Sequence, residues 1–241
     1  MRYIYLSPHL DDAVLSAGGL IYEQVKAGTP VEIWTFMAGI PAEAELTDFA
    51  KAMHKMWNTT TAENTVRIRR KEDQKAAAVL GAKAVQFDFL DCIYRRGKNG
   101  EALYAGASTP PHPAEADLPA QLAQTMVAWL KPDDVAICQL AIGGHVDHVI
   151  VRKAAEMLGR QLVYDADIPY LFNYPGELSP KTAGMKAAVQ PVSKAGYAAW
   201  LKAIGAYSSQ LGSLFENPSI MREKMQGYWS ESKGVRFWKF E

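Results

Sequence analysis

The stretch YIYLSPHLDD, residues 3–12, carries the first signal that decides the fold. Its first half, residues 3–6, is a short apolar run that predicts a buried β-strand. Apolar side chains then recur at helical spacing over residues 12–27, and Gly28 and Pro30 supply a stop signal for that helix. A second strand-like run, residues 31–36, follows at once. Residues 7–12, with the polar side chains of Ser7, His9, Asp11 and Asp12, therefore lie at the junction between a strand and a helix.

The same alternation continues along the chain and predicts an α/β fold. Further strands are expected at residues 84–90, 134–140 and 162–165, and further helices at residues 66–80, 116–130, 148–159 and 194–211. Strands that alternate with helices favour a mostly parallel sheet with helices on both faces. We expect one domain over residues 1–241, with a helical insertion at 41–65 and an irregular C-terminal extension at 171–241.

The composition describes a packed globular protein and argues against several partners. Hydrophobic residues make up 49% of the chain, and 26 basic residues balance 26 acidic ones. A net charge of zero gives no electrostatic reason to bind nucleic acid or an anionic membrane. No apolar run suggests a membrane span or a secretion signal, so we expect a cytoplasmic location. Cys92 and Cys138 are far apart, which favours two core thiols over a disulfide or a zinc site.

Three other segments bear on the fold and the function. The insertion carries an apolar stripe at helical spacing, for which we favour core packing: Leu46, Phe49, Ala50, Met53, Met56 and Trp57. The aromatic residues of the C-terminal part form either a sugar-binding surface or core, and we favour core: Trp200, Tyr207, Tyr228, Trp229, Phe237 and Trp238. Residues 95–113 are rich in glycine and proline and predict a long surface loop, a feature that is often functional.

Two histidine motifs follow predicted strands. In the first, His9 and Asp12 stand three residues apart, and imidazole with carboxylate suits a divalent metal such as zinc. In the second, residues 143–148 read GGHVDH and open the next predicted helix. Each motif alone also fits an ordinary polar helix start. Together, at the carboxyl ends of two strands, they predict one shared metal site.

Counting ligands assigns a role to each polar residue of the two motifs. His9, Asp12 and His148 supply three ligands and leave a coordination position open, as catalytic zinc sites do. Asp11 is then free to act as a general base. His145 is also free, and we expect Asp147 to fix its tautomer and favour its charged form, which suits a developing oxyanion.

The two motifs resemble those of the LmbE-like and PIG-L zinc N-deacetylases. Residues 9–12, HLDD, and 145–148, HVDH, carry the resemblance, and five weaker matches support it: residues 18–19, 69–81, 89–91, 165–170 and 207–211. Many members have proline at positions 10 and 146 and glutamate at position 13. Here those residues are Leu10, Val146 and Ala13, which leaves the expected ligands and base unchanged.

The resemblance implies a Rossmann-like three-layer sandwich and a function. Members are hydrolases that remove the acetyl group from N-acetylated sugars or sugar conjugates of the N-acetylglucosamine type. By resemblance His9, Asp12 and His148 bind zinc, Asp11 is the base and His145 steadies the transition state. The arginine that contacts substrate corresponds best to Arg69, although a helix-surface role near Glu72 fits equally well.

Several alternatives stay open at this point. Tyr170, just after the strand that ends near Asp165, is the best single candidate for a further substrate contact. The substrate is a small N-acetylated molecule in the favoured interpretation, and another amide, such as a thiol conjugate, in the alternative. A ligand set of two histidines and one carboxylate also fits Fe²⁺ or another divalent metal. A non-catalytic metabolite-binding protein would need a glycine-rich phosphate loop after the first strand, which residues 7–12 do not form. The sequence allows a homo-oligomer.

Overall fold

The computed structural model describes residues 1–42 and 45–241. Its sheet has seven strands in the order β3-β2-β1-β4-β5-β7-β6. The strands are β1 (Tyr3–Ser7), β2 (Val31–Thr35), β3 (Lys83–Gln86), β4 (Val135–Gln139), β5 (Val163–Asp165), β6 (Lys186–Pro191) and β7 (Gly234–Lys239). Strands β1 to β5 pair in parallel, whereas β7 runs antiparallel to both β5 and β6. The predicted α/β fold with a mostly parallel sheet is confirmed.

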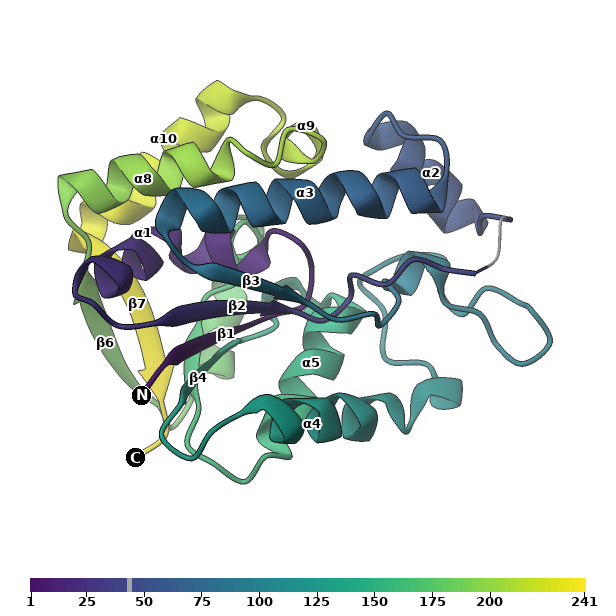
Figure 1. The fold of residues 1–241 in the computed structure, drawn as a ribbon, viewed down its shortest axis with the longest axis horizontal. Helices are drawn as coiled ribbons and strands as arrows, with labels where there is room; N and C mark the ends of the chain where they lie inside the picture. Colours follow the sequence, from purple (N-terminus) through teal and green to yellow (C-terminus); the bar gives the residue numbers. More distant parts are fainter. Residues whose placement is uncertain (43–44) are drawn as a thin grey trace.

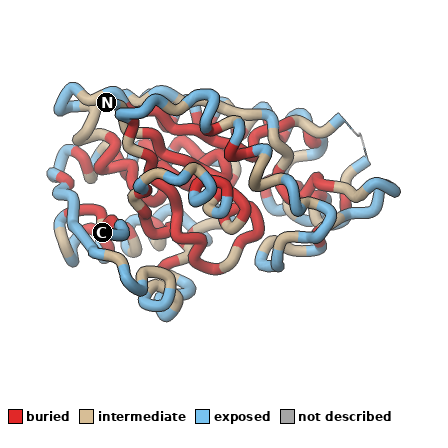
Figure 2. Tube along the Cα trace, turned by 90° about the horizontal axis from the view of Figure 1, so that it is seen from below, coloured by how far each residue is buried: buried red, intermediate tan, exposed pale blue. Residues whose placement is uncertain are grey.

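Helices cover both faces of this sheet (Figure 1). They are α1 (Asp12–Lys26), α2 (Asp48–Met56), α3 (Ala62–Leu80), α4 (Leu118–Trp129), α5 (Val146–Glu156), α6 (Tyr170–Asn173), α7 (Leu178–Lys181), α8 (Lys194–Ile204), α9 (Leu211–Phe215) and α10 (Pro218–Ser232). Helices α1, α3 and α8 lie on one face, and α4 and α5 lie on the other. Buried residues concentrate along the central strands between these two layers (Figure 2).

The strand order creates the position of the site. Strand β1 pairs with β2 on one side and with β4 on the other. The order of the parallel strands therefore reverses beside β1, and ligands of open α/β sheets bind at the carboxyl ends of the strands at such a point. Both histidine motifs follow these two strands: one connects β1 to α1, and the other connects β4 to α5.

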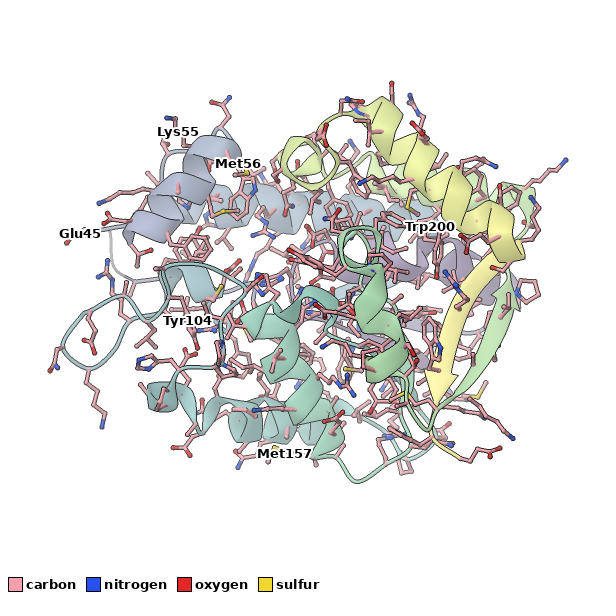
Figure 3. The ribbon with its side chains drawn as sticks, turned by 180° about the vertical axis from the view of Figure 1, so that it is seen from behind. Glu45, Lys55, Met56, Tyr104, Met157 and Trp200 are labelled. Carbon is pink, nitrogen blue, oxygen red and sulfur yellow. The ribbon has the colours of Figure 1, made fainter. Side chains whose placement is uncertain are left out.

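Close packing between α1 and α8 explains one weak sequence match. A Cβ atom added to Gly18 would lie 2.5 Å from Trp200, and one added to Gly19 would lie 2.9 Å from it. Trp200, labelled in Figure 3, is fully buried and donates from Nε1 to the carbonyl oxygen of Val14 at 2.6 Å. The pair of glycines therefore lets the C-terminal helix lie directly on α1.

The C-terminal part differs from the irregular extension expected for residues 171–241. It supplies two strands of the same sheet and two long helices, α8 and α10. The six aromatic side chains singled out in the sequence are buried, so their interpretation as core is confirmed: Trp200, Tyr207, Tyr228, Trp229, Phe237 and Trp238. The pattern was hard to read because β6 is exposed along its whole length and shows no apolar alternation.

Other boundaries shift for local reasons. The expected strand at 84–90 ends at Gln86, because the chain then leaves the ladder and Asp88 forms only an isolated bridge to Met37. Helix α3 begins at Ala62 rather than at residue 66, since the Thr61 side chain caps it by accepting from the backbone N–H of Asn64. The insertion at 41–65 contains α2, and its residues 43–44 lie outside the described residues.

Candidate active site

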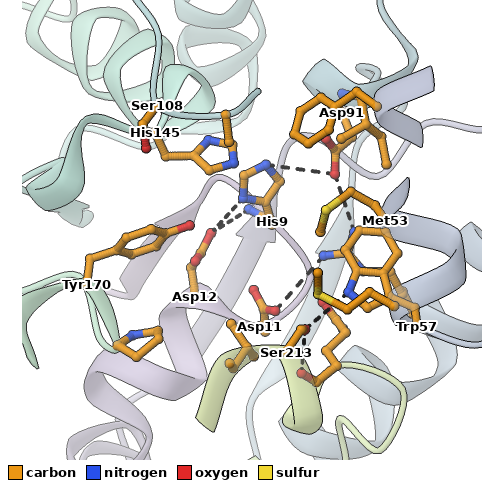
Figure 4. Close-up of a pocket in the computed structure, with 18 of the residues that line it drawn as sticks. His9, Asp11, Asp12, Met53, Trp57, Asp91, Ser108, His145, Tyr170 and Ser213 are labelled. Atoms are coloured by element: carbon orange, nitrogen blue, oxygen red, sulfur yellow. Dashed lines mark hydrogen bonds and ion pairs between the residues drawn. The ribbon is translucent and has the colours of Figure 1, made fainter. Parts of the chain in front are cut away.

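A cavity of about 350 Å³ lies at the carboxyl ends of β1 and β4. Figure 4 shows His9, Asp11, Asp12 and His145 together at its inner end. Helices α2 and α9 contribute side chains to its outer part. The long loop at 95–113 also reaches it, through Ala107 and Ser108. The loop therefore contributes to the candidate site, as its length and composition suggested.

His9 is held between two carboxylates. Its Nδ1 lies 3.3 Å from Asp12 Oδ2, and its Nε2 lies 2.9 Å from Asp147 Oδ2. The loop between β1 and α1 fixes this geometry, since Asp12 Oδ2 accepts from the backbone N–H of His9 at 2.7 Å. The hydroxyl of Ser7 accepts from the backbone N–H of Ala13 and caps the start of α1.

His148 approaches the same carboxylate from the second motif. Its Nε2 lies 3.4 Å from Asp12 Oδ2, and its Nδ1 lies 2.8 Å from Asp167 Oδ1. His148 is buried, and its Nε2 has no hydrogen-bond partner among residues 1–42 and 45–241. A buried imidazole nitrogen of this kind requires an explanation, and a bound cation supplies one.

The residues present fit a divalent metal such as Zn²⁺. Zinc bonds of about 2.0–2.1 Å in tetrahedral geometry place neighbouring donor atoms roughly 3.3–3.4 Å apart, and Asp12 Oδ2 lies 3.3 and 3.4 Å from the facing nitrogens of His9 and His148. Each histidine turns its other ring nitrogen to a buried carboxylate, Asp147 or Asp167, as metal-binding histidines commonly do. Ring nitrogens of His9, His145 and His148 lie within 4.8 Å of one another, so His145 borders the same space.

Asp11 and Arg69 form the second group of charged residues in the cavity. Arg69 Nη2 lies 4.0 Å from Asp11 Oδ2, and Nη1 lies 3.3 Å from Asp91 Oδ2. The guanidinium also stacks over the Trp57 ring at 4.6 Å. Arg69 is buried and lines the cavity, so its interpretation as a helix-surface residue is wrong.

The charges around the imidazoles shift their pKa values in opposite directions. Burial lowers the pKa of His9, but the carboxylates of Asp91, Asp12 and Asp147 outweigh burial and raise it well above its usual value. Burial, followed by repulsion from the other two imidazoles, lowers the pKa of His145 well below its usual value.

The pKa values of the adjacent residues Asp11 and Asp12 also shift in opposite directions. Burial and the neighbouring charge of Asp12 raise the pKa of Asp11 to about 7. For Asp12, burial acts in the same direction, but His148 and His9 outweigh it and lower the pKa below its usual value. Two carboxylates at adjacent positions thus differ because only one of them faces the imidazoles.

The environment of Asp147 corrects one expectation. Its carboxylate contacts His9, the backbone N–H of Cys92 and Arg95, and it does not orient the ring of His145. Only the backbone N–H of Asp147 reaches that ring, donating to His145 Nδ1 at 3.2 Å. An accepting Nδ1 leaves the proton of neutral His145 on Nε2. The expected charged form of His145 is not favoured either, because its pKa is lowered.

Tyr170 reaches the site because the second motif begins with glycines. Gly143 has a φ of +78°, and a Cβ atom there would lie 2.7 Å from Tyr170 Cδ1. The Tyr170 ring lines the cavity with its centroid 5.1 Å from that of His148 and 6.2 Å from that of His145. All the residues predicted for the site therefore lie at one end of the sheet.

Sequence reasoning missed the roles of several residues of the site. Asp91, Asp167 and Gln210 fall in segments that carried the family resemblance, but the sequence pattern indicated no role for them. Gln210 lines the cavity and is buried, and its Nε2 has no hydrogen-bond partner in the described chain. The apolar stripe of the insertion was interpreted as core packing, yet four of its residues line the cavity: Phe49, Met53, Met56 and Trp57. Helical periodicity finds an apolar face but does not say what the face covers.

Comparisons with known proteins find deacetylases of similar fold. One similar solved structure is the zinc-inhibited form of teicoplanin deacetylase, with 27% identity over 99% of this chain and 97% of that chain and a TM-score of 0.86. Another is the A40926 pseudoaglycone deacetylase, with 26% identity over 99% of this chain and 96% of that chain and a TM-score of 0.78. The N,N'-diacetylchitobiose deacetylase of Pyrococcus horikoshii has the same fold, with 16% identity, 99% and 82% coverage and a TM-score of 0.58. A search of curated proteins found no match.

The family comparison covers most of the chain. The model of the family described as GlcNAc-PI de-N-acetylase, PIG-L, matches residues 4–158, a range that contains both histidine motifs. Among the described residues, no helix has the length and hydrophobicity needed to cross a membrane. The resemblance inferred from the two motifs is confirmed, and the chain belongs to the PIG-L family of de-N-acetylases.

Proposed function

We propose that the protein is a metal-dependent hydrolase that removes the acetyl group from an N-acetylated sugar or sugar conjugate. One observation carries the proposal. Asp12 Oδ2 lies within 3.4 Å of a nitrogen of His9 and of His148, at the inner end of a cavity that also holds Asp11, Arg69 and His145. Family membership and the deacetylase relatives support the same reaction.

We propose His9, Asp12 and His148 as the metal ligands. These residues would hold a divalent metal such as Zn²⁺, whose chemistry there would be to polarise a carbonyl and to make water a stronger nucleophile near neutral pH. Asp11 accepts the proton of the attacking water as general base. It suits this role because it lines the cavity next to the proposed ligand Asp12, and its Oδ2 lies 4.0 Å from Arg69 Nη2.

His145 and Asp147 complete the catalytic set. Neutral His145 donates from Nε2 to the negative charge that develops on the acetyl carbonyl oxygen, since its Nδ1 accepts from the backbone. Asp11, which has taken the proton of the attacking water, then gives it to the leaving amine. Asp147 acts on the metal ligand His9 rather than on His145.

The remaining cavity residues suit a sugar with an attached apolar group. Arg69, Tyr170 and the amide of Gln210 offer polar contacts for hydroxyl or carbonyl oxygens. Phe49, Met53 and Met56 form an apolar wall farther out, which suits a conjugate more than a free sugar. We propose that this wall selects among N-acetylated conjugates. The cytoplasmic location and the homo-oligomer stay predictions.

A substrate screen tests the proposal. The purified protein, loaded with Zn²⁺, is incubated with N-acetylglucosamine and with N-acetylglucosaminides that carry alkyl or aryl aglycones, and free amine is measured with and without a chelator. We expect release that the chelator abolishes and that is faster for the aglycone-bearing compounds. Zinc-loaded protein that releases amine from none of them would contradict the proposed substrate class. Metal analysis of protein purified without added metal, together with oxygen uptake, tests the iron alternative.

A further inference from the structure

Asp147 lies behind the proposed ligand His9 and is itself held by an arginine. The carboxylate is fully buried. Its Oδ2 accepts from the backbone N–H of Cys92 at 3.0 Å and faces His9 Nε2 at 2.9 Å. Its Oδ1 accepts from Arg95 Nη1 at 2.5 Å. Both carboxylate oxygens are therefore held in place, Oδ2 by His9 and the backbone of Cys92, and Oδ1 by Arg95.

Arg95 is in turn fixed by the segment that leads into and out of the long loop. Its Nη1 also donates to the carbonyl oxygen of Leu90 at 3.0 Å, and its Nε lies 2.6 Å from Glu115 Oε1. The guanidinium stacks over the Tyr104 ring at 5.1 Å, and the Tyr104 hydroxyl donates to Glu115 Oε2 at 2.5 Å. The hydrogen bonds of Nη1, the ion pair at Nε and the ring contact on its face together restrict the orientation of the guanidinium.

The charges show why Asp147 needs this partner. A histidine that binds a metal through Nδ1 is a neutral imidazole that donates from Nε2, so it contributes no positive charge to Asp147. Within 4.0 Å of the Asp147 carboxylate, the described residues then offer a single cationic side chain, Arg95. A buried carboxylate without a paired cation is strongly destabilised.

We propose that Arg95 is a positioning residue of the metal centre, which balances the charge of Asp147 and holds its carboxylate against His9 Nε2. The proposal rests on the proposed metal-dependent function. It makes Arg95 and the segment at 95–115 part of the support for the ligand set, although Arg95 reaches the metal site only through Asp147.

The neighbouring Arg96 is a matched control. It has the same side chain one position later, but its guanidinium donates to the backbone carbonyl oxygens of Gly100 and Glu45 and contacts neither Asp147 nor His9. Replacing Arg96 removes one positive charge from the same loop without touching the Asp147 carboxylate.

The test measures zinc affinity by competition with a chromophoric chelator, on the full chain with its metal removed. Arg95→Met is expected to weaken zinc binding by about tenfold, the lower end of the effect of losing a group that supports a metal ligand. Arg96→Met is expected to keep the affinity of the unaltered protein. An unchanged affinity in Arg95→Met would overturn the proposal.

A double-mutant cycle shows whether Arg95 acts through Asp147. In an Asp147→Asn background, Arg95→Met is expected to cause no further loss of zinc affinity, and a full tenfold further loss would contradict the proposed route. Circular dichroism of each metal-free variant checks folding. If Arg95→Met does not fold, Arg95→Lys replaces it: we expect a smaller loss of affinity that disappears in the Asp147→Asn background, and no loss would again overturn the proposal. Failure of the unaltered protein to bind zinc would instead reject the proposed metal site.

Discussion

The inner and outer ends of the cavity are built in different ways. At the inner end, buried polar side chains hold one another: Asp12 faces two imidazoles, and each imidazole turns its second nitrogen to a further carboxylate. At the outer end, α2 presents apolar side chains that are partly or largely exposed, and the side chain of Met56 is 59% exposed. The inner end is suited to one chemical reaction, and the outer end is suited to selecting among substrates.

The side chain of Trp57 connects the two ends of the cavity. Trp57 donates from its indole Nε1 to the Ser213 hydroxyl at 3.2 Å and stacks against Arg69 at 4.6 Å (Figure 4). It therefore joins α2 to the turn of α9 while it supports a charged residue near Asp11. Changes at the inner end are expected to alter metal binding or the rate of the chemical step, whereas changes on the wall are expected to alter which substrates are accepted.

The largest effect is expected from removing a proposed ligand. His148→Ala deletes the nitrogen that faces Asp12 Oδ2, so metal binding should weaken by more than the roughly 10–100-fold caused by losing a supporting group, and activity should be lost. Bound zinc is measured by elemental analysis after dialysis. His112→Ala, at an exposed histidine of the long loop, is the control and should keep its metal. A His148→Ala protein that still binds a full complement of zinc would contradict the assignment of metal binding to the inner end of the cavity.

Asp11→Asn is expected to separate chemistry from metal binding. Its carboxylate is not among the proposed ligands, so zinc should be retained, while loss of the general base should lower kcat by about 10²–10⁴-fold. Steady-state kinetics and zinc content are measured on the same preparation. Asp133→Asn, at an exposed position, should leave both unchanged. Near-normal turnover in Asp11→Asn would refute the assigned base.

A smaller and selective effect is expected on the wall. Met56→Ala removes part of the apolar surface and should lower kcat/KM for aglycone-bearing substrates by roughly 2–5-fold, with little change for free N-acetylglucosamine and none in zinc affinity. Met157→Ala is a matched control, because Met157 is 58% exposed and does not line the cavity. Equal losses for substrates with and without an aglycone would show that the wall does not select.

The smallest effect is expected on the pH dependence of folding stability, through the buried residue Asp73. Burial raises the pKa of Asp73 to about 6, although its carboxylate accepts from Gln86 and Tyr207. The folded state then binds a proton more tightly than the unfolded state, so stability should fall as pH rises from about 4 to 6, by on the order of 2 kcal/mol. Asp73→Asn should flatten this dependence in thermal unfolding, whereas Asp48→Asn at an exposed position should not. An unchanged slope in Asp73→Asn would contradict the assigned shift.

The sequence predicted the inner end far better than the outer end. Strand and helix periodicity placed residues 7–12 and 143–148 at the carboxyl ends of neighbouring strands, and the chemistry of histidine and aspartate then indicated a metal. The partners behind the ligands were harder to find, because Asp147 and Asp167 contact His9 and His148 over 138 and 19 residues of sequence. Only the folded chain shows which imidazole each carboxylate faces.

The outer end was misread because apolar periodicity has two meanings. The stripe on α2 looked like core, and Ala50 and Trp57 are indeed buried, but Met53 and Met56 face the cavity. Strand β6 was missed for the opposite reason, since it lies at the edge of the sheet and buries none of its residues. Burial at such positions is decided by segments far away in the sequence.

Anomalous diffraction at the zinc absorption edge, from crystals of protein purified without chelator, tests the central claim most directly. A single peak is expected about 2.0–2.2 Å from His9 Nδ1, Asp12 Oδ2 and His148 Nε2. A bound metal located elsewhere, with these three atoms turned away from it, would contradict the assignment of the site and the reaction derived from it.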